Sequence, residues 1–406
     1  MEEKKRIFIA IHYMEIGGAE RSLLGLLNAF DTSHYEVDLF LYSHRGEFMP
    51  LIPEKIHLLP EIATYASLEK PIIQILKEGH WLIAGARLWA KWKCAHYRKH
   101  HPVKNDASIF QYVANTTTRF LPSLKKYGEY DLAISFLTPH NIVLKKVNAK
   151  KKIAWIHTDY SYIQVNTAIE LPVWSGYDYI ASISEAVTES FLHVFPSLKN
   201  KIVLIENILS PSFIRQQADM ENVSKEMEAP ANSIKFCSVG RFTDAKNFDN
   251  VPWILKEIRT QGIDAYWFIV GYGGDEALIR NQIQKANMEK YVILLGKKTN
   301  PYPYIKNCDF YIQPSRYEGK AVTVREAQIL HKPVIITNFA TSRSQLRNGI
   351  DGAIVPLDIS GCAKAISQIV TNKKLVSFWI QNIKKSNYGN ETEVHKIEQL
   401  MNMKAL

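Results

Sequence analysis

The chain has 406 residues, of which 46% are hydrophobic and 22% are charged. This composition is that of a globular protein and excludes a disordered, collagen-like or coiled-coil chain. At roughly 150 residues per domain, the length predicts two to three domains rather than one small binding module. A formal net charge of +10 favours an anionic partner, namely nucleic acid, a phosphorylated small molecule or an acidic lipid surface.

The apolar runs and the cysteines favour a cytoplasmic protein. The run over residues 7–11 is short and meets His12 at once, so it predicts a first buried strand rather than a signal peptide. No uncharged apolar stretch reaches about 18 residues, so no membrane-spanning helix is expected. Four widely separated cysteines support neither a disulfide framework nor a zinc site: Cys94, Cys237, Cys308 and Cys362.

Short β-branched apolar runs alternate with longer amphipathic stretches, which predicts βαβ units and parallel sheets. In the first half the expected strands are Arg6–His12, Glu36–Tyr42, Leu132–Phe136, Lys152–His157, Tyr179–Ser182 and Lys201–Ile205. The expected helices there are Ala19–Phe30, the Leu76–Tyr97 region and Glu185–Val194.

Residues 77–104, within a helical region over 66–128, are basic and rich in tryptophan. Leu88, Trp89 and Trp92 have helical spacing, with a basic face opposite. This pattern is typical of a helix that lies in the headgroup layer of an anionic membrane. A solvated helical hairpin whose tryptophans pack on the domain is the alternative interpretation.

A polar, acidic segment without apolar periodicity, residues 216–232, predicts a linker. The alternation then begins afresh, with expected strands Ile234–Val239, Ala265–Val270, Val292–Leu295, Phe310–Gln313, Val334–Thr337 and Ala353–Val355. The expected helices are Phe248–Thr260, Glu276–Ala286, Tyr302–Asn307, Val322–His331 and Cys362–Val370.

The sequence therefore predicts an α/β protein with two doubly wound Rossmann-like domains that face each other across a cleft. We expect an N-terminal domain over 1–215, a linker over 216–232, a C-terminal domain over 233–375, and a helical tail over 376–406 that crosses back to the first domain.

Two glutamates, Glu318 and Glu326, follow the expected strand Phe310–Gln313 at a spacing of eight positions. With the first at the start of a helix and the second two turns inside it, they lie about 12 Å apart along the axis, which matches a nucleotide sugar. A pyrophosphate would bind the backbone N–H groups of the helix N-terminus, near residues 320–322. The two carboxylates would accept hydrogen bonds from sugar and ribose hydroxyls.

Gly240 and Arg241 directly follow the first expected strand of the second half, and Lys246 comes a few residues later. Glycine lets the chain turn sharply there, and the two cations together neutralise a diphosphate leaving group. A pair of surface cations at the end of a strand is the plain alternative.

Further candidates lie at the carboxyl ends of other strands. Gly17 and Gly18 connect the first strand to a helix whose N-terminus would point into the cleft, and Gly271 opens a tight turn. His157 closes a buried strand, where a neutral imidazole either binds a sugar hydroxyl or is a satisfied core histidine.

Together these residues resemble the retaining glycosyltransferases of family 4, which have the GT-B fold. The resemblance covers nearly the whole chain. It rests on Gly-Gly-Ala-Glu-Arg at 17–21, the Gly-Arg and Lys-Asn pairs at 240–241 and 246–247, the Val-Gly-Tyr-Gly-Gly loop at 270–274, and the paired glutamates. Two features depart from the family. Lys320 stands where many relatives have Phe, and the basic Trp-rich stretch resembles the membrane-facing segments of enzymes that use lipid-linked acceptors.

The resemblance implies hexosyl transfer from an NDP-sugar, UDP being the commoner base, to a glycan or lipid-linked saccharide in bacterial capsule or surface-polysaccharide assembly. The acceptor would bind the first domain and the donor the second, with no metal required and the protein peripheral at the inner face of the cell membrane. The implied catalytic residues are His157, Glu318, Arg241 and Lys246. The implied donor-binding residues are Gly17, Gly18, Gly240, Arg241, Lys246, Gly271, Gly319, Lys320, Ala321, Val322 and Glu326.

Two other functions remain open at this stage. A nucleotide-sugar 2-epimerase or hydrolase would share the two-domain fold and the diphosphate site but would need no acceptor. A peripheral nucleic-acid-binding protein would stack its tryptophans on bases, but the aromatic and basic residues are confined to one stretch and no recognition motif accompanies them. We therefore expect no nucleic-acid partner.

Overall fold

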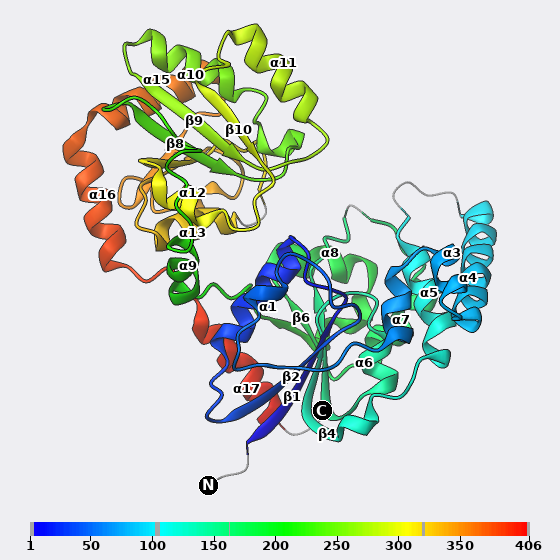
Figure 1. Ribbon diagram of the computed structural model, residues 1–406. Helices are drawn as coiled ribbons and strands as arrows, with labels where there is room; N and C mark the ends of the chain where they lie inside the picture. The colour runs from blue at the N-terminus through cyan, green and yellow to red at the C-terminus, as the bar shows by residue number, and fades with distance from the viewer. Residues whose placement is uncertain (1–3, 102–105, 162, 319–320, 404–406) are drawn as a thin grey trace. The chain divides into compact units, whose positions relative to one another are not determined.

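The computed structural model describes residues 4–101, 106–161, 163–318 and 321–403. The chain forms two compact units, the first made of residues 1–208 and 391–406 and the second of residues 209–390 (Figure 1). The boundary expected after residue 215 thus falls inside a helix of the second unit, Pro211–Ala218, and the segment expected as a linker belongs to that unit as well.

The first unit contains a parallel sheet in the order β3-β2-β1-β4-β5-β6-β7. Its strands are β1 (Lys5–Ile11), β2 (Tyr35–Leu41), β3 (His57–Leu58), β4 (Glu129–Ser135), β5 (Asn148–Ile156), β6 (Tyr179–Ser182) and β7 (Ile202–Leu204). All five residues of β1 from Ile7 to Ile11 are buried. This continuous burial is expected of a strand in a parallel sheet whose two faces are both covered by helices.

The helices of the first unit belong to two separate segments of the chain, residues 1–208 and residues 391–406. They are α1 (Gly18–Ala29), α2 (Ala63–Ala66), α3 (Ile72–Lys77), α4 (Trp81–His100), α5 (Ser108–Thr117), α6 (Asn141–Lys146), α7 (Thr167–Ser175), α8 (Glu185–Val194) and α17 (Val394–Asn402). The start of α8 shows how the local sequence sets a boundary, because the Ser184 hydroxyl accepts a hydrogen bond from the Val187 N–H at 3.2 Å.

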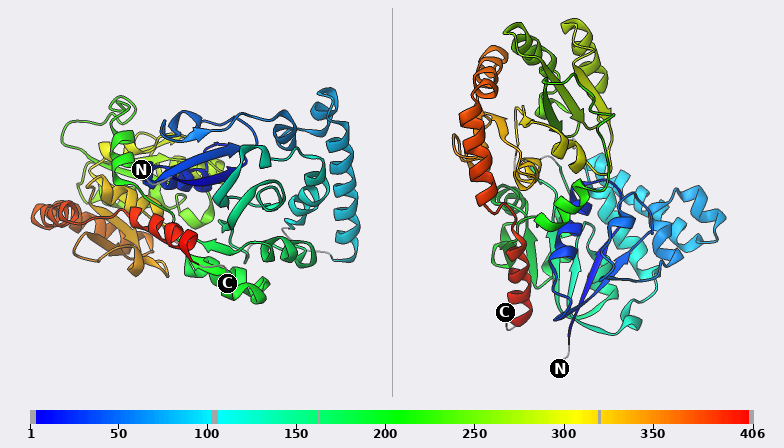
Figure 2. Two further views of the ribbon diagram at one scale, coloured as in Figure 1. Left: turned by 90° about the horizontal axis from the view of Figure 1, so that it is seen from below. Right: turned by 60° about the vertical axis from the view of Figure 1, so that its left-hand side comes forward.

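Helix α17 completes the first unit, and Figure 2 shows it, in red, beside the strands of the first sheet. The buried ammonium group of Lys151, on β5, donates a hydrogen bond to the Leu400 carbonyl at 2.9 Å. Lys396 donates to the Leu204 carbonyl at 3.0 Å, and the Glu206 N–H donates to the Glu393 carboxylate at 2.9 Å. The last turns of the chain therefore satisfy polar groups of the first sheet.

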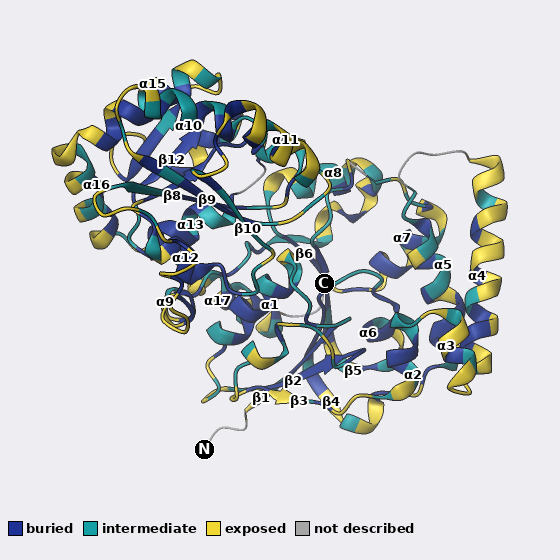
Figure 3. Ribbon diagram, turned by 45° about the horizontal axis from the view of Figure 1, so that its top comes forward, coloured by how far each residue is buried: buried dark blue, intermediate teal, exposed yellow. Residues whose placement is uncertain are grey.

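Helix α4 has many exposed residues (Figure 3), and its tryptophans are among them rather than packed on the domain. Trp81, Trp89 and Trp92 are 68%, 48% and 58% exposed. The opposite face holds small or apolar residues and is buried: Ile83, Ala84, Ala86, Ala90 and Cys94. The interpretation as a hairpin whose tryptophans pack on the domain is therefore wrong. The prediction of a basic face opposite the tryptophans is also wrong, because basic side chains such as Lys93 share the exposed surface with the tryptophans.

Among the residues that the structure describes, no helix combines the length and the apolar composition that are needed to span a bilayer.

The second unit repeats the same plan with a parallel sheet in the order β10-β9-β8-β11-β12-β13. Its strands are β8 (Ile234–Val239), β9 (Ala265–Val270), β10 (Val292–Gly296), β11 (Phe310–Gln313), β12 (Val334–Thr337) and β13 (Gly352–Val355). Its helices are α9 (Pro211–Ala218), α10 (Val251–Thr260), α11 (Glu276–Ala286), α12 (Tyr302–Asn307), α13 (Val322–Ile329), α14 (Ser342–Gln345), α15 (Ile359–Thr371) and α16 (Lys373–Lys385).

Two helix glycines differ in what surrounds them. A Cβ atom added to Gly25, in α1, would lie 1.9 Å from the Ile208 carbonyl oxygen, whereas one added to Gly85, in α4, would meet nothing within 4 Å. We expect Gly25→Ala to lower the free energy of unfolding of the first unit by about 1–3 kcal/mol, because backbone must shift to relieve the overlap. Gly85→Ala, the matched control, should raise it by about 0.5–1 kcal/mol. Guanidinium chloride unfolding measures both, and equal effects of the two substitutions would contradict the close approach.

Candidate functional site

The order of the strands reverses at one point in each sheet, between β1 and β4 in the first and between β8 and β11 in the second. Loops that follow two such strands leave toward opposite sides and open a crevice at the carboxyl edge, where ligands of doubly wound sheets bind. In the second unit, Lys246 follows β8 and Glu318 follows β11. These two predicted site residues therefore belong to the two loops that flank the reversal.

Three side chains donate hydrogen bonds to one oxygen atom of Glu318. The distances to Oε1 are 2.5 Å from Lys246 Nζ, 2.6 Å from Ser315 Oγ and 2.9 Å from Gln313 Nε2. No hydrogen bond between described residues reaches the other oxygen, Oε2. A carboxylate that is 8% exposed needs such donors, because burying an ionised group without partners is costly.

Backbone packing brings the β8 and β9 loops together beneath Lys246. A Cβ atom at Gly271 would lie 1.9 Å from the Gly240 carbonyl oxygen, so only glycine fits at position 271. The Lys246 side chain runs over Gly240, since a Cβ atom there would lie 3.1 Å from Lys246 Cε. Arg241 is exposed and makes no hydrogen bond or ion pair with any described residue. Its guanidinium is thus available to a ligand.

Glu326 lies on α13 and is completely buried, and its Oε1 accepts a hydrogen bond from the Tyr302 hydroxyl at 3.0 Å. Glu318 lies outside α13, which begins at Val322, so the rise of a helix alone does not set the spacing of the two glutamates.

The structure describes only some of the backbone N–H groups that are expected to bind a pyrophosphate. The Ala321 N–H donates to Gln345 Oε1 at 3.1 Å, so it is already satisfied within the chain. The predicted residues Gly319 and Lys320 lie outside the described residues.

Gly17 and Gly18 stand at the start of α1 in the first unit. A Cβ atom at Gly17 would lie 2.1 Å from Glu20 Oε2, so the chain's own carboxylate lies beside the N-terminus of this helix. Burial raises the pKa of Glu20, and the charge of Glu15 adds to this shift. The N-terminus of α1, expected to receive phosphates, therefore faces an acidic side chain.

His157 follows β5 and contacts Phe136 and Trp155, with ring centroids 4.6 Å and 6.1 Å away. Burial lowers the pKa of His157 to about 3, which keeps its imidazole neutral near pH 7. Its Nε2 atom is buried and has no hydrogen-bond partner among the described residues. His140 is also kept neutral near pH 7, because burial and the charges of His12 and His157 lower its pKa to about 3. Its Nε2 atom is likewise buried without a hydrogen-bond partner among the described residues.

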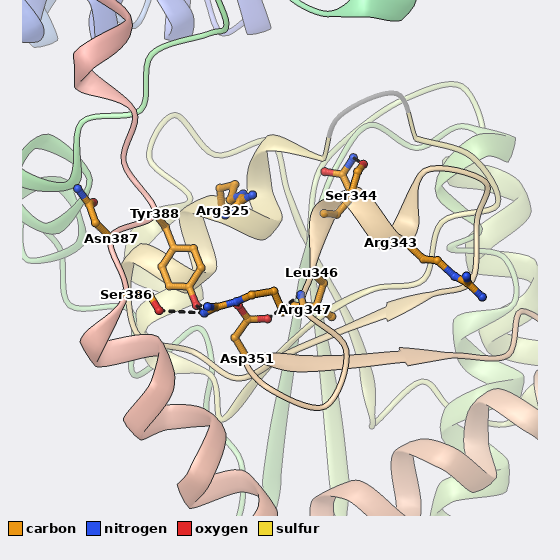
Figure 4. Close-up of a pocket in the computed structure, with 10 residues that line it drawn as sticks. Arg325, Arg343, Ser344, Leu346, Arg347, Asp351, Ser386, Asn387 and Tyr388 are labelled. Atoms are coloured by element: carbon orange, nitrogen blue, oxygen red, sulfur yellow. Dashed lines mark hydrogen bonds and ion pairs between the residues drawn. The ribbon is translucent and has the colours of Figure 1, made fainter.

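A separate cavity of about 420 Å³ lies in the second unit (Figure 4). Its central cation, Arg347, donates to Asp351 at 2.7 Å, to Ser386 at 2.9 Å and to the Tyr388 hydroxyl at 3.1 Å. This arginine holds the segment after α16 in place. The described residues that line the cavity include none of the predicted donor-binding residues.

Sequence reasoning missed several polar residues of the site. Gln313 and Ser315 bind Glu318, and Tyr302 binds Glu326. Asn247, which is buried with a φ of 59°, donates from its side chain to the Pro314 carbonyl at 2.8 Å and so ties the β8 loop to the β11 loop. The sequence shows the Lys-Asn pair, but only the positive φ of Asn247 explains why Asn, which tolerates this conformation, follows the lysine.

The four cysteines are buried and free, and no cluster of three or more potential metal ligands occurs among the described residues.

Residues 219–386 match the family model of glycosyl transferases group 1. The chain is 28% identical over 156 residues to an uncharacterized glycosyltransferase of Methanocaldococcus jannaschii, a match that covers 37% of each chain. It is 26% identical over 176 residues to the UDP-Gal:α-D-GlcNAc-diphosphoundecaprenol α-1,3-galactosyltransferase of Escherichia coli, which covers 42% of this chain and 45% of that enzyme. Each of these two matches spans less than half of the relative.

Solved structures match over almost the whole chain. A glycosyltransferase from Rickettsia africae aligns over 98% of both chains with a TM-score of 0.65 and 14% identity. The Anabaena protein HepE, in complex with UDP and glucose, aligns over 99% of this chain and 100% of its own with a TM-score of 0.65 and 14% identity. These likenesses show the GT-B fold and confirm the prediction of two Rossmann-like domains.

The buried histidines predict how stability depends on pH. Between pH 6.5 and 3 the unfolded chain binds a proton at His140 and at His157 that the folded chain does not bind, so stability falls as the pH falls through this range. Each ring contributes at most about 1.4 kcal/mol per pH unit. Unfolding titrations at pH 7, 6 and 5 should show a flatter pH dependence for His140→Asn than for the unmodified protein. His100→Asn, at an exposed position of α4, is the control, and an identical slope for both variants would contradict the assignment.

Proposed function

We propose that the protein is a retaining glycosyltransferase that moves a sugar from an NDP-sugar, with UDP as the nucleotide, to a glycan or lipid-linked saccharide in the assembly of a cell-surface polysaccharide. The observation that carries this proposal is the convergence of Lys246, Gln313 and Ser315 on Glu318 at the strand-order reversal of the second sheet. This cluster lies within the segment that matches the glycosyl transferase family model.

Two cations of the β8 loop, Arg241 and Lys246, suit a diphosphate leaving group. Breaking the bond between the sugar and the diphosphate develops negative charge on the departing oxygen, and fixed cations stabilise that charge more than they stabilise the ground state. Arg241 has no partner in the described part of the chain, and Lys246 already points its ammonium group at Glu318. In this proposal the two cations bind the diphosphate, while Oε2 of Glu318 accepts a hydrogen bond from the donor sugar.

The remaining predicted residues take complementary parts in the proposal. Glu326 accepts hydrogen bonds from the ribose, and the neutral ring of His157 forms a hydrogen bond with the sugar near the reacting carbon. For the nucleotide, support comes from HepE, whose structure contains UDP, and from the galactosyltransferase relative, whose name specifies a UDP-sugar. The same relative, by name, uses an acceptor on diphosphoundecaprenol, which supports a lipid-linked acceptor here.

The exposed face of α4 supports a peripheral location at an anionic membrane. Trp89 and Trp92 stack at 4.8 Å, and Lys93 lies over the Trp89 ring at 5.4 Å. A helix that combines exposed aromatic side chains with cations binds at the boundary between acyl chains and acidic headgroups. In this proposal α4 holds the enzyme at the surface where a lipid-linked acceptor is found.

The donor site is tested by two substitutions. Arg241→Ala should lower kcat about 100-fold, because one cation that stabilises the leaving diphosphate is lost. Glu326→Ala should mainly raise the donor KM, by about 10- to 100-fold, through loss of hydrogen bonds to a charged group. Steady-state transfer from radiolabelled UDP-sugars, together with UDP titration calorimetry, measures both effects.

Arg280→Ala, at an exposed arginine of α11 that pairs with Glu276, is the control and should behave as the unmodified protein does. Equal activity of Arg241→Ala and the unmodified protein would exclude the diphosphate site. Failure of UDP and GDP alike to bind at millimolar concentration would overturn the proposed function.

The membrane role is tested by the double substitution of Trp89 and Trp92 to serine. Both side chains are about half exposed, so their loss should leave the fold intact while removing apolar area that a membrane would bury. We expect binding to vesicles that contain phosphatidylglycerol to fall at least about tenfold in a sedimentation assay. Unchanged binding would show that α4 is not the membrane-binding element.

A further inference from the structure

The strand-order reversal of the first sheet carries a cavity of its own. It has a volume of about 420 Å³ and lies at the carboxyl edge, where His12 follows β1, Tyr42 follows β2 and residues 137–139 follow β4. Helices α4 and α5 close its other side. This is the position at which a doubly wound sheet binds its ligand, and none of the predicted site residues lines it.

The inner part of the cavity holds polar atoms that the described part of the chain leaves without partners. His12 Nε2 and the Tyr42 hydroxyl are buried and make no hydrogen bond there. His12 is held in place through its other nitrogen, since Nδ1 lies 2.9 Å from Glu69 Oε1. Buried polar groups are normally satisfied, so these two atoms indicate a ligand that offers hydroxyl groups.

One wall of the cavity carries cations. Arg87 is fixed by hydrogen bonds from Nη1 to the Lys70 carbonyl at 2.5 Å and to the Ser67 carbonyl at 3.2 Å, while its buried Nε has no partner among the described residues. Lys91 lies one turn further along α4, is exposed, and lines the same cavity. A fixed guanidinium beside an exposed ammonium suits a phosphate.

The only acid among the described lining residues is Glu69. Burial tends to raise the pKa of Glu69, but the hydrogen bond from His12 and the charges of His12, Arg45 and Arg87 outweigh this effect and lower it. Glu69 is thus ionised and engaged with His12, and it leaves Lys91 at the mouth of the cavity without an acidic neighbour in the lining.

Most of the remaining wall is apolar and is made by Leu68, Ile109, Val113, Ala114, Leu137, Pro139 and Ile142, while Tyr13 and Thr138 add polar side chains. Phe110, also part of the lining, is 66% exposed and so stands at the mouth. Thr117, the last residue of α5, and Thr118, which follows it, add no free hydroxyl, because they donate to the carbonyls of Val113 and Ala114. The lining therefore combines hydroxyl-binding groups, cations and apolar side chains, and its exposed members Lys91 and Phe110 stand at the mouth.

We infer that this cavity binds the acceptor, and that the acceptor is a saccharide joined through phosphate to an isoprenoid chain. The sugar hydroxyls meet His12 and Tyr42, the phosphate meets Arg87 and Lys91, and the chain leaves past Phe110. The inference rests on the proposed function, since it assigns a place and a chemical class to the acceptor of that reaction.

The test uses the full chain and geranyl diphosphate as the probe, with geraniol and inorganic diphosphate as partial probes. By titration calorimetry, geranyl diphosphate should bind at least tenfold more tightly than either part, because cations and apolar wall act together. Lys91→Glu should weaken its binding about tenfold by reversing the charge at the mouth. Val113→Trp should abolish binding by filling the cavity. Lys145→Glu, a charge reversal at an exposed position of α6, should change nothing.

UDP titration of the same samples separates this inference from the proposed function, because Arg241, Lys246 and Glu326, to which that function assigns the diphosphate and the ribose, belong to the second unit. If UDP binds but geranyl diphosphate binds no better than inorganic diphosphate, or binds equally to Lys91→Glu and to the unmodified protein, the acceptor assignment is overturned and the proposed function stands. If UDP does not bind, the proposed function fails, and tight binding of geranyl diphosphate that Lys91→Glu weakens would still place a phosphorylated lipid in the cavity. Binding to phosphatidylglycerol vesicles without binding of the probe would assign the surface to the membrane and overturn the acceptor site.

Discussion

The reversal of strand order within each parallel sheet is the constraint on which the chemistry of this protein depends. Every strand in a doubly wound sheet is followed by a crossover, and the crossovers on either side of the reversal leave in opposite directions. The backbone cannot fill the edge between them, so side chains and ligands must. In the second unit this edge holds Lys246 and Glu318, and in the first it holds a cavity that begins at His12.

The two edges use buried polar groups differently. Glu318 is surrounded by donors on one oxygen, an arrangement that makes a buried carboxylate tolerable and fixes its orientation. His12 and Tyr42 instead retain buried polar atoms that no described neighbour satisfies. The edge of the first sheet therefore satisfies fewer of its own buried polar atoms. A ligand that supplies hydrogen bonds would stabilise this edge more than the edge of the second sheet.

The sequence predicted the sheets far better than the contacts within the site. β8, β9, β11 and β12 begin and end as expected, because continuous apolar runs in buried parallel strands are visible without knowledge of the fold. The short helix α9 was missed, since its buried residues Phe213, Ile214, Gln217 and Ala218 overlap a segment whose later residues are polar and acidic. The types of residue at the donor site were recognised, but the pairing of Lys246 with Glu318 joins positions 72 apart and depends on the neighbouring positions of β8 and β11. The exposure of the α4 tryptophans was likewise left open, because helical spacing alone does not tell which face packs on small residues.

The contribution of α17 to the first unit has a consequence for biosynthesis. Residues 1–208 leave the ribosome first, yet the ammonium group of Lys151 finds its acceptor at Leu400 only after the entire second unit has been translated. A nascent first unit must therefore persist without this helix and without its hydrogen bonds to Lys151 and Leu204, while nearly two hundred further residues are added. The first unit can thus close only after the second unit has been synthesised.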